Sequence, residues 1–365
     1  MSDKKIVFIT PSIKTGGGNR VFIELANELC IKNKVFIVYP NNSKQKHTFI
    51  LHPVVDCKGI GKIVQGKISK VLNIFKTIRY INKAHYNDHI IISDPIFVLF
   101  FFLIKGKHKY RFMQADDYRI YDDGLVLGKG LLLALYKRLC LCGYKAKINF
   151  IFNSKYVYDC YVKDAKRPDT SFFLVHPAIN HNIFNSHGRK KNDEKQKKVI
   201  SLVARQHPWK GLVTFINVYK KLSNETKNLI QEIILISHDD LSDFDTTGMK
   251  IVTPTNDLDI ASVYQQSDIF VSTSWWEGFG LPPLEAMACG CAVITSDSGG
   301  VNEYAKNNEN CLMFKPKEEK DLIEKIIQLI DDNKLIEKLI GGSMITAQQF
   351  TWKTSAEKLI EILSK

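Results

Sequence analysis

The feature that most constrains the fold is an alternation of short β-branched runs with longer segments of helical periodicity, which continues along the whole chain. This alternation is typical of parallel β-sheets whose strands are joined by crossover helices. At roughly 150 residues per domain, a chain of 365 residues is long enough for two such domains. The predicted strands are residues 6–10, 35–39, 90–93, 110–114, 148–153, 199–204, 232–237, 250–252, 268–272 and 292–295.

The boundary between the two predicted α/β domains lies near a polar stretch without apolar periodicity, residues 186–198, which is typical of a linker or exposed loop. We expect a first doubly wound domain over residues 1–180 and a second over 181–345. The last segment, 346–365, has apolar residues at helical spacing and predicts a helix. It could close the second domain or cross back to the first.

The charge is unevenly distributed. The whole chain carries +13, which suggests an anionic partner. Residues 1–180 hold 29 Lys and Arg against 13 Asp and Glu, whereas residues 181–365 hold 22 against 25. The asymmetry indicates two domains with different surfaces, one of which faces something negative. A merely Lys-rich, solvated face is an equal alternative.

The eight cysteines form no C-x-x-C pair, and the amino-terminal residues lack the apolar core of a signal peptide. The longest apolar run, Ile96–Ile104, is about half of what a bilayer crossing needs. We therefore expect a cytoplasmic protein with reduced cysteines.

Two basic amphipathic stretches, Gly61–His85 and Gly128–Lys147, lie in the first half. Either could be an interfacial helix on an anionic inner leaflet, which would make the protein peripheral at the inner membrane face. Core helices with solvated basic faces are the alternative.

The stretch Asp268–Gly300 carries the clearest chemical signal. It reads as a buried strand, a glycine-bearing loop, and a helix that opens at one of two prolines. Backbone N–H groups of Gly280 and Leu281 would point at a phosphate, and the positive end of the helix dipole favours it. Gly278 and Gly280 let a ligand approach the backbone closely.

Two carboxylates bracket this loop. Glu285 is placed to accept hydrogen bonds from a ribose diol, and Glu277 to touch a sugar or its leaving phosphate. Taken alone, a helix cap and a first-turn acid would be the better interpretation. Upstream, however, Arg205 and Lys210 can converge on a diphosphate at the carboxyl edge of the sheet, which favours a functional role for the set.

Together these motifs resemble the retaining glycosyltransferases of family 4 (glycosyl transferases group 1). The two acids lie in "EGFGLPPLEAMACG" and the two cations in "ARQHPWKG". Further similar elements are "TGGGNR", "VHPAINHNIF", "SDSGGVNEY" and "FTWKTSAEKL", so the resemblance covers nearly the whole chain. It implies the GT-B fold, with two Rossmann-like domains facing across a cleft. It also implies transfer of a sugar from a nucleotide-diphosphate donor to a hydroxyl of a glycan or lipid-linked glycan, with the anomeric configuration kept.

The resemblance places the acceptor in the first domain and the donor in the second. Glu277, Arg205 and Lys210 are the implied catalytic residues; because the two cations and the helix N-terminus would stabilise the leaving diphosphate, neither a metal nor another cofactor is expected. Where the family usually has a first-domain histidine, this chain has Gln114 and Asp116, which become the candidate cleft groups. The implied donor-binding residues are Gly278, Phe279, Gly280, Leu281, Glu285, Gly17 and Gly18.

Acidic pairs that could mimic a metal site include the D-x-D triplets at 243–245 and 257–259 and adjacent aspartates beginning at 116, 122, 239 and 331. Such pairs are common, and structural roles are favoured for them. A GT-B epimerase or phosphorylase is an alternative function. A nucleic-acid-binding protein would explain the charge, but no nucleic-acid module is present. The sugar, nucleotide base, acceptor and oligomeric state stay open.

Overall fold

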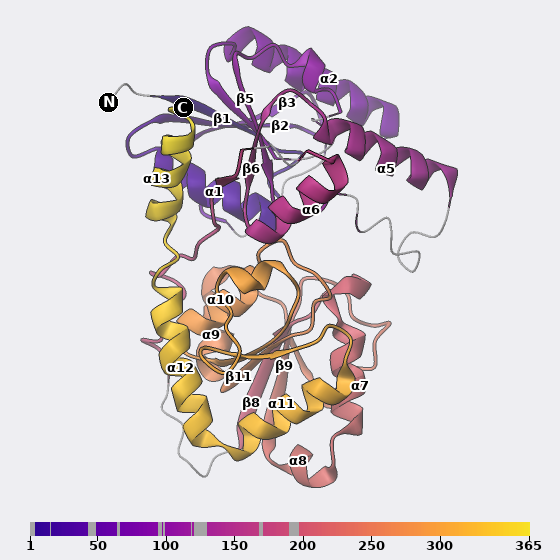
Figure 1. The fold of residues 1–365 in the computed structure, drawn as a ribbon, viewed down its shortest axis with the longest axis vertical. Helices are drawn as coiled ribbons and strands as arrows, with labels where there is room; N and C mark the ends of the chain where they lie inside the picture. Colours follow the sequence, from indigo (N-terminus) through magenta and orange to yellow (C-terminus); the bar gives the residue numbers. More distant parts are fainter. Residues whose placement is uncertain are drawn as a thin grey trace. The chain divides into compact units, whose positions relative to one another are not determined.

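The chain divides into two compact units in the computed structural model. The first unit comprises Met1–Pro177 and Trp352–Lys365, and the second unit comprises Ala178–Thr351 (Figure 1). The first unit therefore ends slightly before residue 180, and residues 346–351 belong to the second unit. The structure describes residues 4–14, 16–42, 49–63, 66–93, 97, 99–117, 119, 130–167, 171–189 and 197–365. Most of the stretch expected to be a linker, residues 190–196, lies outside these ranges.

The first unit is built on a seven-stranded parallel sheet in the order β3-β2-β1-β4-β5-β6-β7. The order reverses between β1 and β4, so this is a doubly wound sheet with its switch point there. The β-branched and aromatic strand residues are buried because helices cover both faces. The strands are β1 Lys5–Ile9, β2 Lys34–Pro40, β3 Asp56–Ile60, β4 His89–Ile92, β5 His108–Met113, β6 Asn149–Phe152 and β7 Phe173–Leu174.

Side chains alternate between the two faces of a sheet along each strand, so the strand residues that a helix contacts show which face it covers. Phe22 on α1 contacts the rings of Phe8 and Phe112 on one face. Ile74 on α2 packs with Val7 on the opposite face. The helical segments are α1 Gly17–Leu29, α2 Lys67–Ala84, η1 Phe101–Leu103, α5 Leu131–Tyr144, α6 Lys155–Ala165 and α13 Trp352–Ile362.

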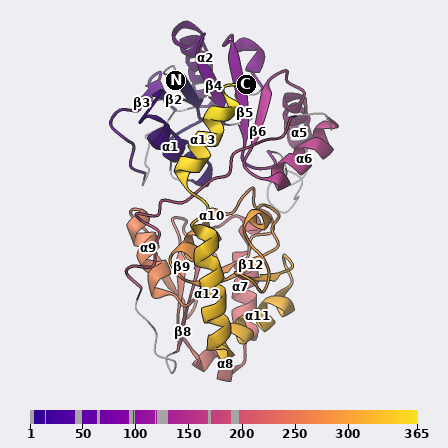
Figure 2. The same ribbon diagram turned by 60° about the vertical axis from the view of Figure 1, so that its left-hand side comes forward.

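The final helix, α13, belongs to the first unit and lies beside α1 (Figure 2). It buries Trp352, Ala356 and Leu359, which recur at helical spacing. The Ser355 hydroxyl donates a hydrogen bond to the carbonyl of His176 at 2.7 Å. Of the two positions that the sequence left open for this segment, the structure thus has the return to the first unit.

The second unit repeats the same architecture with a six-stranded parallel sheet in the order β10-β9-β8-β11-β12-β13. One cluster of its core joins aliphatic side chains from the strands and the flanking helices with Phe215 and Phe314. The strands are β8 Lys198–Val203, β9 Ile230–Ile236, β10 Lys250–Val252, β11 Ile269–Ser272, β12 Ala292–Ser296 and β13 Leu312–Phe314. The helical segments are η2 Pro208–Lys210, α7 Leu212–Lys221, α8 Asn224–Asn228, α9 Asp257–Gln266, α10 Leu281–Ala288, η3 Gly300–Glu303, α11 Glu319–Asp331 and α12 Asn333–Ala347.

All ten predicted strands are present, and the prediction of two doubly wound parallel sheets is confirmed. Three strands were missed: β3, β7 and β13. Each lies at the edge of its sheet, and β7 and β13 are only two and three residues long. An edge strand has only one neighbour, and β3, with the sequence "DCKGI", has no buried residue, so it carries little of the apolar signal that reveals a central strand.

Candidate functional site

The switch point of the second sheet lies between β8 and β11, where ligands of open parallel sheets bind at the carboxyl ends of the strands. Arg205 follows the end of β8, and the loop that carries Glu277 follows the end of β11. The two motifs that the sequence singled out, whose charged residues are 67 to 80 positions apart in the chain, therefore meet at the edge expected for a ligand.

Lys210 and Glu277 form an ion pair, with 2.6 Å between Nζ and Oε1 and side chains that are 30% and 18% exposed. The two loops that carry them are tied together by their backbones. The amide of Trp275 donates to the carbonyl of Trp209 at 2.7 Å, and the Thr273 hydroxyl donates to the carbonyl of Lys210 at 3.1 Å. The pair is therefore partly exposed, and hydrogen bonds to the backbone hold its two loops together.

Gly211 allows this close approach of the two loops. Its φ is +71°, and a Cβ at this position would lie 2.0 Å from the carbonyl oxygen of Thr273. A side chain is excluded both by the backbone conformation and by the space. The loop after β8 is thus built to lie directly against the loop after β11.

An aromatic stack lies on the same two loops. The rings of His207 and Trp209 are parallel to within 11° at 4.4 Å, and those of Trp209 and Trp276 to within 14° at 5.8 Å. Burial and the neighbouring Arg205 lower the pKa of His207, so its ring is neutral near pH 7. The sequence analysis missed this stack, although "QHPWK" and "SWWEG" place its rings beside the two predicted site residues.

The glycine loop after Glu277 is held by the segment that follows β12. The amide of Glu277 donates to Ser298 at 2.8 Å, and the amide of Gly300 donates to the Glu277 carbonyl at 3.0 Å. A Cβ on Gly300 would lie 2.2 Å from the carbonyl oxygen of Gly278. The backbone around Gly278 is therefore fixed in place by a contact that only glycine at position 300 permits.

Helix α10 begins directly after this loop, at Leu281, and its first turn contains the two prolines that predicted it. Gly280 precedes the helix with φ +84°, and its carbonyl accepts a hydrogen bond from the hydroxyl of Tyr304. Burial raises the pKa of Tyr304, which keeps this hydroxyl protonated and able to donate. Gly290, at φ +82°, follows the helix end, where glycine is favoured.

The side chains of three predicted donor-binding residues are buried in the second unit. The ring of Phe279 is 3% exposed and packs on Tyr304 at 5.4 Å. Leu281 is also buried, and Glu285 on α10 is 4% exposed. The Phe279 and Leu281 side chains thus shape the loop from within, which leaves their backbone groups as the parts that can meet a ligand.

Arg205 is partly exposed and donates from Nε to the carboxylate of Asp239 at 2.8 Å. Burial works against ionisation of Asp239, but the hydrogen bonds from Arg205 and the Gln206 amide prevail and lower its pKa. This ion pair holds Arg205 at the carboxyl end of β8, beside β9.

Other acidic pairs also have structural partners. Asp245 pairs with Lys220 at 2.6 Å. Asp259 forms a capping box with Asn256 at the start of α9. The pair that begins at 122 lies outside the described residues.

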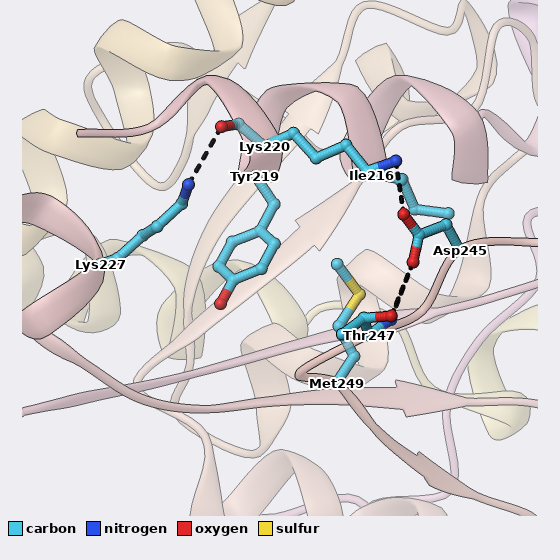
Figure 3. A pocket seen from close by; sticks show the side chains of 7 residues that line it. All are labelled: Ile216, Tyr219, Lys220, Lys227, Asp245, Thr247 and Met249. Carbon is cyan, nitrogen blue, oxygen red and sulfur yellow. Dashed lines mark hydrogen bonds and ion pairs between the residues drawn. The ribbon is translucent and has the colours of Figure 1, made fainter. Parts of the chain in front are cut away.

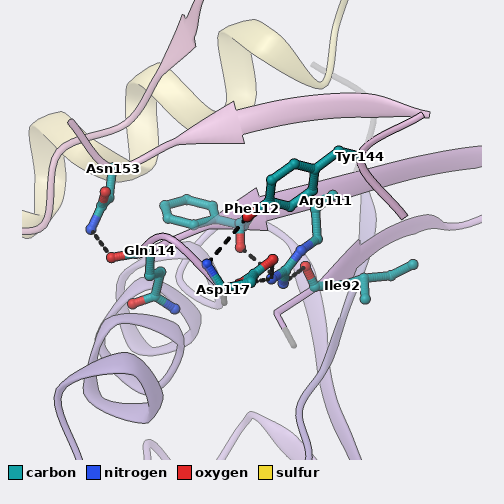
Figure 4. Close-up of polar contacts among 7 residues, drawn as sticks. All are labelled: Ile92, Arg111, Phe112, Gln114, Asp117, Tyr144 and Asn153. Carbon is teal, nitrogen blue, oxygen red and sulfur yellow. Dashed lines mark hydrogen bonds and ion pairs between the residues drawn. The ribbon is translucent and has the colours of Figure 1, made fainter. Parts of the chain in front are cut away.

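In the first unit, the predicted residues Gln114 and Gly18 lie next to each other at the carboxyl edge of the sheet. The Gln114 amide donates to the Gly18 carbonyl at 3.1 Å, and the amide of Asn153 donates to the Gln114 carbonyl at 2.9 Å (Figure 4). Gly17 is the first residue of α1. Asp116, two residues after Gln114, has a half-buried side chain.

Beneath this edge the first unit buries a charge that the sequence analysis missed. Arg111 is 1% exposed, and its guanidinium pairs with both carboxylate oxygens of Asp117, at 2.8 and 3.1 Å (Figure 4). It also donates to the carbonyl of Ile92 at 3.2 Å. The available signal was an arginine inside the otherwise apolar run "YRFM".

A small pocket of about 190 Å³ lies elsewhere in the second unit, between α7, α8 and the loop before β10 (Figure 3). Lys220 and Asp245 line it, and no predicted site residue does. It therefore gives no support to the candidate site.

Comparison with known proteins agrees with this geometry. Residues 247–342, which include Glu277 and Glu285, match the family described as glycosyl transferases group 1. An N-acetylgalactosaminyltransferase of Campylobacter jejuni, whose named substrate is N,N'-diacetylbacillosaminyl-diphospho-undecaprenol, is 37% identical over 29% of this chain and 28% of its own length. An uncharacterized glycosyltransferase of Methanocaldococcus jannaschii is 28% identical over 48% of each chain. The matches thus span less than half the length of these relatives.

Solved structures resemble the chain over almost its full length. Sucrose-phosphate synthase of Thermosynechococcus elongatus aligns with a TM-score of 0.79 and 16% identity over 98% of both chains. HepE of Anabaena, in complex with UDP and glucose, aligns with a TM-score of 0.74 and 16% identity over 99% of this chain and 100% of that one.

The fold is thus that of the GT-B glycosyltransferases, with two parallel-sheet Rossmann-like domains. Within it the chain carries a glycosyl transferases group 1 domain, and the curated relatives that match it are glycosyltransferases. Across the residues that the structure describes, none of the helices combines the length and apolar character needed to span a bilayer.

Proposed function

We propose that this protein is a retaining glycosyltransferase of family 4. It would transfer a sugar from a nucleotide-diphosphate donor to a hydroxyl of a glycan or lipid-linked glycan, in the assembly of a cell-surface polysaccharide or glycolipid. One observation carries the proposal: an accessible Lys210–Glu277 ion pair at the switch point of a parallel sheet, next to the N-terminus of α10.

The hard step of such a reaction is departure of the nucleotide diphosphate, which develops negative charge. Lys210, Arg205 and the first backbone amides of α10 are fixed positive groups at the edge where that charge would appear. Because the folded loops already hold them in place, they need little reorganisation during the reaction. We propose that they stabilise the leaving group without a divalent metal.

We also propose roles for the remaining predicted residues, following the resemblance to the family. In the second unit, Glu277 contacts the transferred sugar and Glu285 the nucleotide ribose. In the first unit, Gln114 and Asp116 take the place of the usual histidine, and Gly17 and Gly18 admit the donor phosphate or the acceptor. Two names support the substrate classes: the Anabaena structure contains UDP, and the Campylobacter relative acts on an undecaprenol-linked sugar.

The test is turnover of nucleotide sugars by Lys210→Met and Glu277→Gln. Each should lower turnover on the order of 100-fold or more, because a preorganised group at the developing charge is lost. Lys250→Met is the matched control, since it breaks the exposed Lys250–Glu232 pair of the same unit and should leave turnover unchanged. Unchanged turnover in both site variants would reject the proposal. Activity that disappears in chelator and returns only with added metal would reject its metal-free part.

A further inference from the structure

Helix α2 of the first unit has two apolar faces, only one of which is buried. Ile74, Ile78 and Ile81 pack into the core against the sheet. A second row at i, i+4 and i+7 points away from it: Ile68 is 80% exposed, Leu72 52% and Phe75 40%. A helix on the surface of a water-soluble domain normally carries one apolar stripe, so Ile68 and Leu72 are not needed to pack α2 against the sheet.

The segment that carries this outer row contains basic residues and no acidic ones. No acidic residue occurs between Asp56 and Asp88, a stretch that contains all of α2. The cations in this stretch are Lys58, Lys62, Lys67, Lys70, Lys76, Arg79 and Lys83. Such a segment attracts an anionic surface and repels a second copy of itself.

A second helix, α5, repeats the pattern. Leu131 is 87% exposed, Leu135 52% and Leu139 40%, again four residues apart. No acidic residue occurs between Asp123 and Asp159. The two helices thus present the same combination of an exposed apolar row and one sign of charge.

The two helices cover the same face of the sheet. Ile92, Arg111 and Phe150 lie on one row across β4, β5 and β6, so their side chains point to one side. Ile92 packs in the cluster that includes α2, and Phe150 in the cluster that includes α5. Phe102 of η1, the segment between β4 and β5, is 66% exposed, and Phe100 two residues earlier contacts the ring of Phe75 on α2.

We propose that this face of the first unit, defined by the exposed apolar residues of α2, η1 and α5, docks on an anionic lipid membrane. The apolar rows would enter the headgroup region while the lysines and arginines meet lipid phosphates. A protein partner is disfavoured because the centres of protein interfaces are depleted in lysine. Membrane docking rests on the proposed function in one respect: docking would bring the enzyme to a lipid-linked acceptor.

The test is co-sedimentation of the full chain with two kinds of vesicle, phosphatidylcholine alone and phosphatidylcholine with one third phosphatidylglycerol. We expect at least 10-fold tighter binding to the anionic vesicles, weakening steeply with salt because the attraction is screened. The double variant Ile68→Ser/Leu72→Ser should lose at least 10-fold of this binding. Ile345→Ser, which removes an equally exposed residue (65%) from α12 of the second unit, is the matched control.

Equal binding to both vesicles, or binding that is indifferent to salt and to the double variant, would overturn the proposal. Self-association in the absence of lipid that the double variant abolishes would also overturn it and would assign the face to a second copy. Hydrolysis of the nucleotide sugar in solution should be unchanged in the double variant. A failure of the membrane proposal is thereby separated from a failure of the proposed reaction.

Discussion

The sheets of the two units have the same strand order over six strands, but the units differ in charge, in exposed apolar surface and in their loops. The first unit carries 32 Lys and Arg against 15 Asp and Glu, whereas the second carries 19 against 23. The first exposes apolar rows on two helices. The distinctive features of the second unit lie in the loops at the switch point. There, glycines allow close backbone contacts, and an ion pair is partly exposed to solvent. One doubly wound topology thus supports two kinds of surface, and the candidate site lies in the loops of the second unit.

The difference extends to how each unit is held together near its candidate residues. The first unit relies on a buried charge, Arg111 with Asp117, below the carboxyl edge of its sheet. The second unit relies on close backbone contacts at Gly211 and Gly300. Variants of these features should therefore fail in different ways.

The largest effect is expected for Arg111→Leu. Removing the arginine takes away the guanidinium that pairs with the carboxylate of Asp117, whose side chain is 9% exposed, and breaking a buried pair costs about 3–5 kcal/mol of stability. Hydrogen exchange of the β5 amides would measure the loss in the first unit. Lys155→Met is the control, because Lys155 and Asp159 are 67% and 54% exposed and their pair should contribute less than about 1 kcal/mol. Equal losses in the two variants would contradict the buried-charge interpretation.

The next effect is expected for Gly300→Ala in the second unit. The new Cβ would overlap the backbone of Gly278 and Phe279, at 2.2 to 2.5 Å, and displace the loop next to Glu277. A shift of about 1 Å at a reacting group can cost on the order of 100-fold in rate, and we expect a loss of that size in nucleotide-sugar turnover.

Gly341→Ala provides the comparison for this variant. A Cβ there meets nothing within 4 Å, and Gly341 lies inside α12, so stability should rise by about 0.5–1 kcal/mol with turnover unchanged. If Gly300→Ala behaved like Gly341→Ala, the loop would not be fixed by this contact.

A smaller effect is expected for Trp209→Ala, which removes the middle ring of the aromatic stack. The loops of Lys210 and Glu277 keep their backbone hydrogen bonds in this variant, so their displacement should be smaller than 1 Å. We therefore expect a fall in kcat of roughly 10-fold, one tenth of the effect of a 1 Å displacement. Trp209→Phe keeps a ring for stacking and should recover most of the activity. A fall in Trp209→Phe as large as in Trp209→Ala would show that stacking is not the cause.

The smallest effect concerns pH and the first unit. Burial, helped by Lys4 and His108 and opposed by Asp88, lowers the pKa of His89 to about 4. Between pH 6.5 and 4, the unfolded chain therefore binds a proton at residue 89 that the folded chain does not. The contribution of neutral His89 to the free energy of unfolding is thus fully present above pH 6.5 and declines as the pH falls to 4. His89→Gln should flatten the pH dependence of the unfolding midpoint in this window. An unchanged slope would assign the pH dependence to other groups.

Much of the fold was predictable because central parallel strands are buried on both faces and appear as continuous apolar runs. The candidate site was indicated by a local motif, the two acids around the glycine loop, and the roles of these residues stay predictions. Arg111 and the aromatic stack were not predictable in the same way. Apart from the carbonyl of the neighbouring Phe112, the partners of Arg111 lie on another strand and in a loop. The rings that stack come from segments more than 60 residues apart.

The sequence by itself determined the fold class, the two-domain organisation, the uneven charge and the stretch around Glu277, because each depends on local pattern or on simple counting. Only the tertiary structure decided that Lys210 lies against Glu277, that Phe279 faces inward, that the final helix returns to the first unit, and that α2 and α5 share one face. These are contacts between distant segments. They depend on strand order, register and close packing, which no local pattern contains.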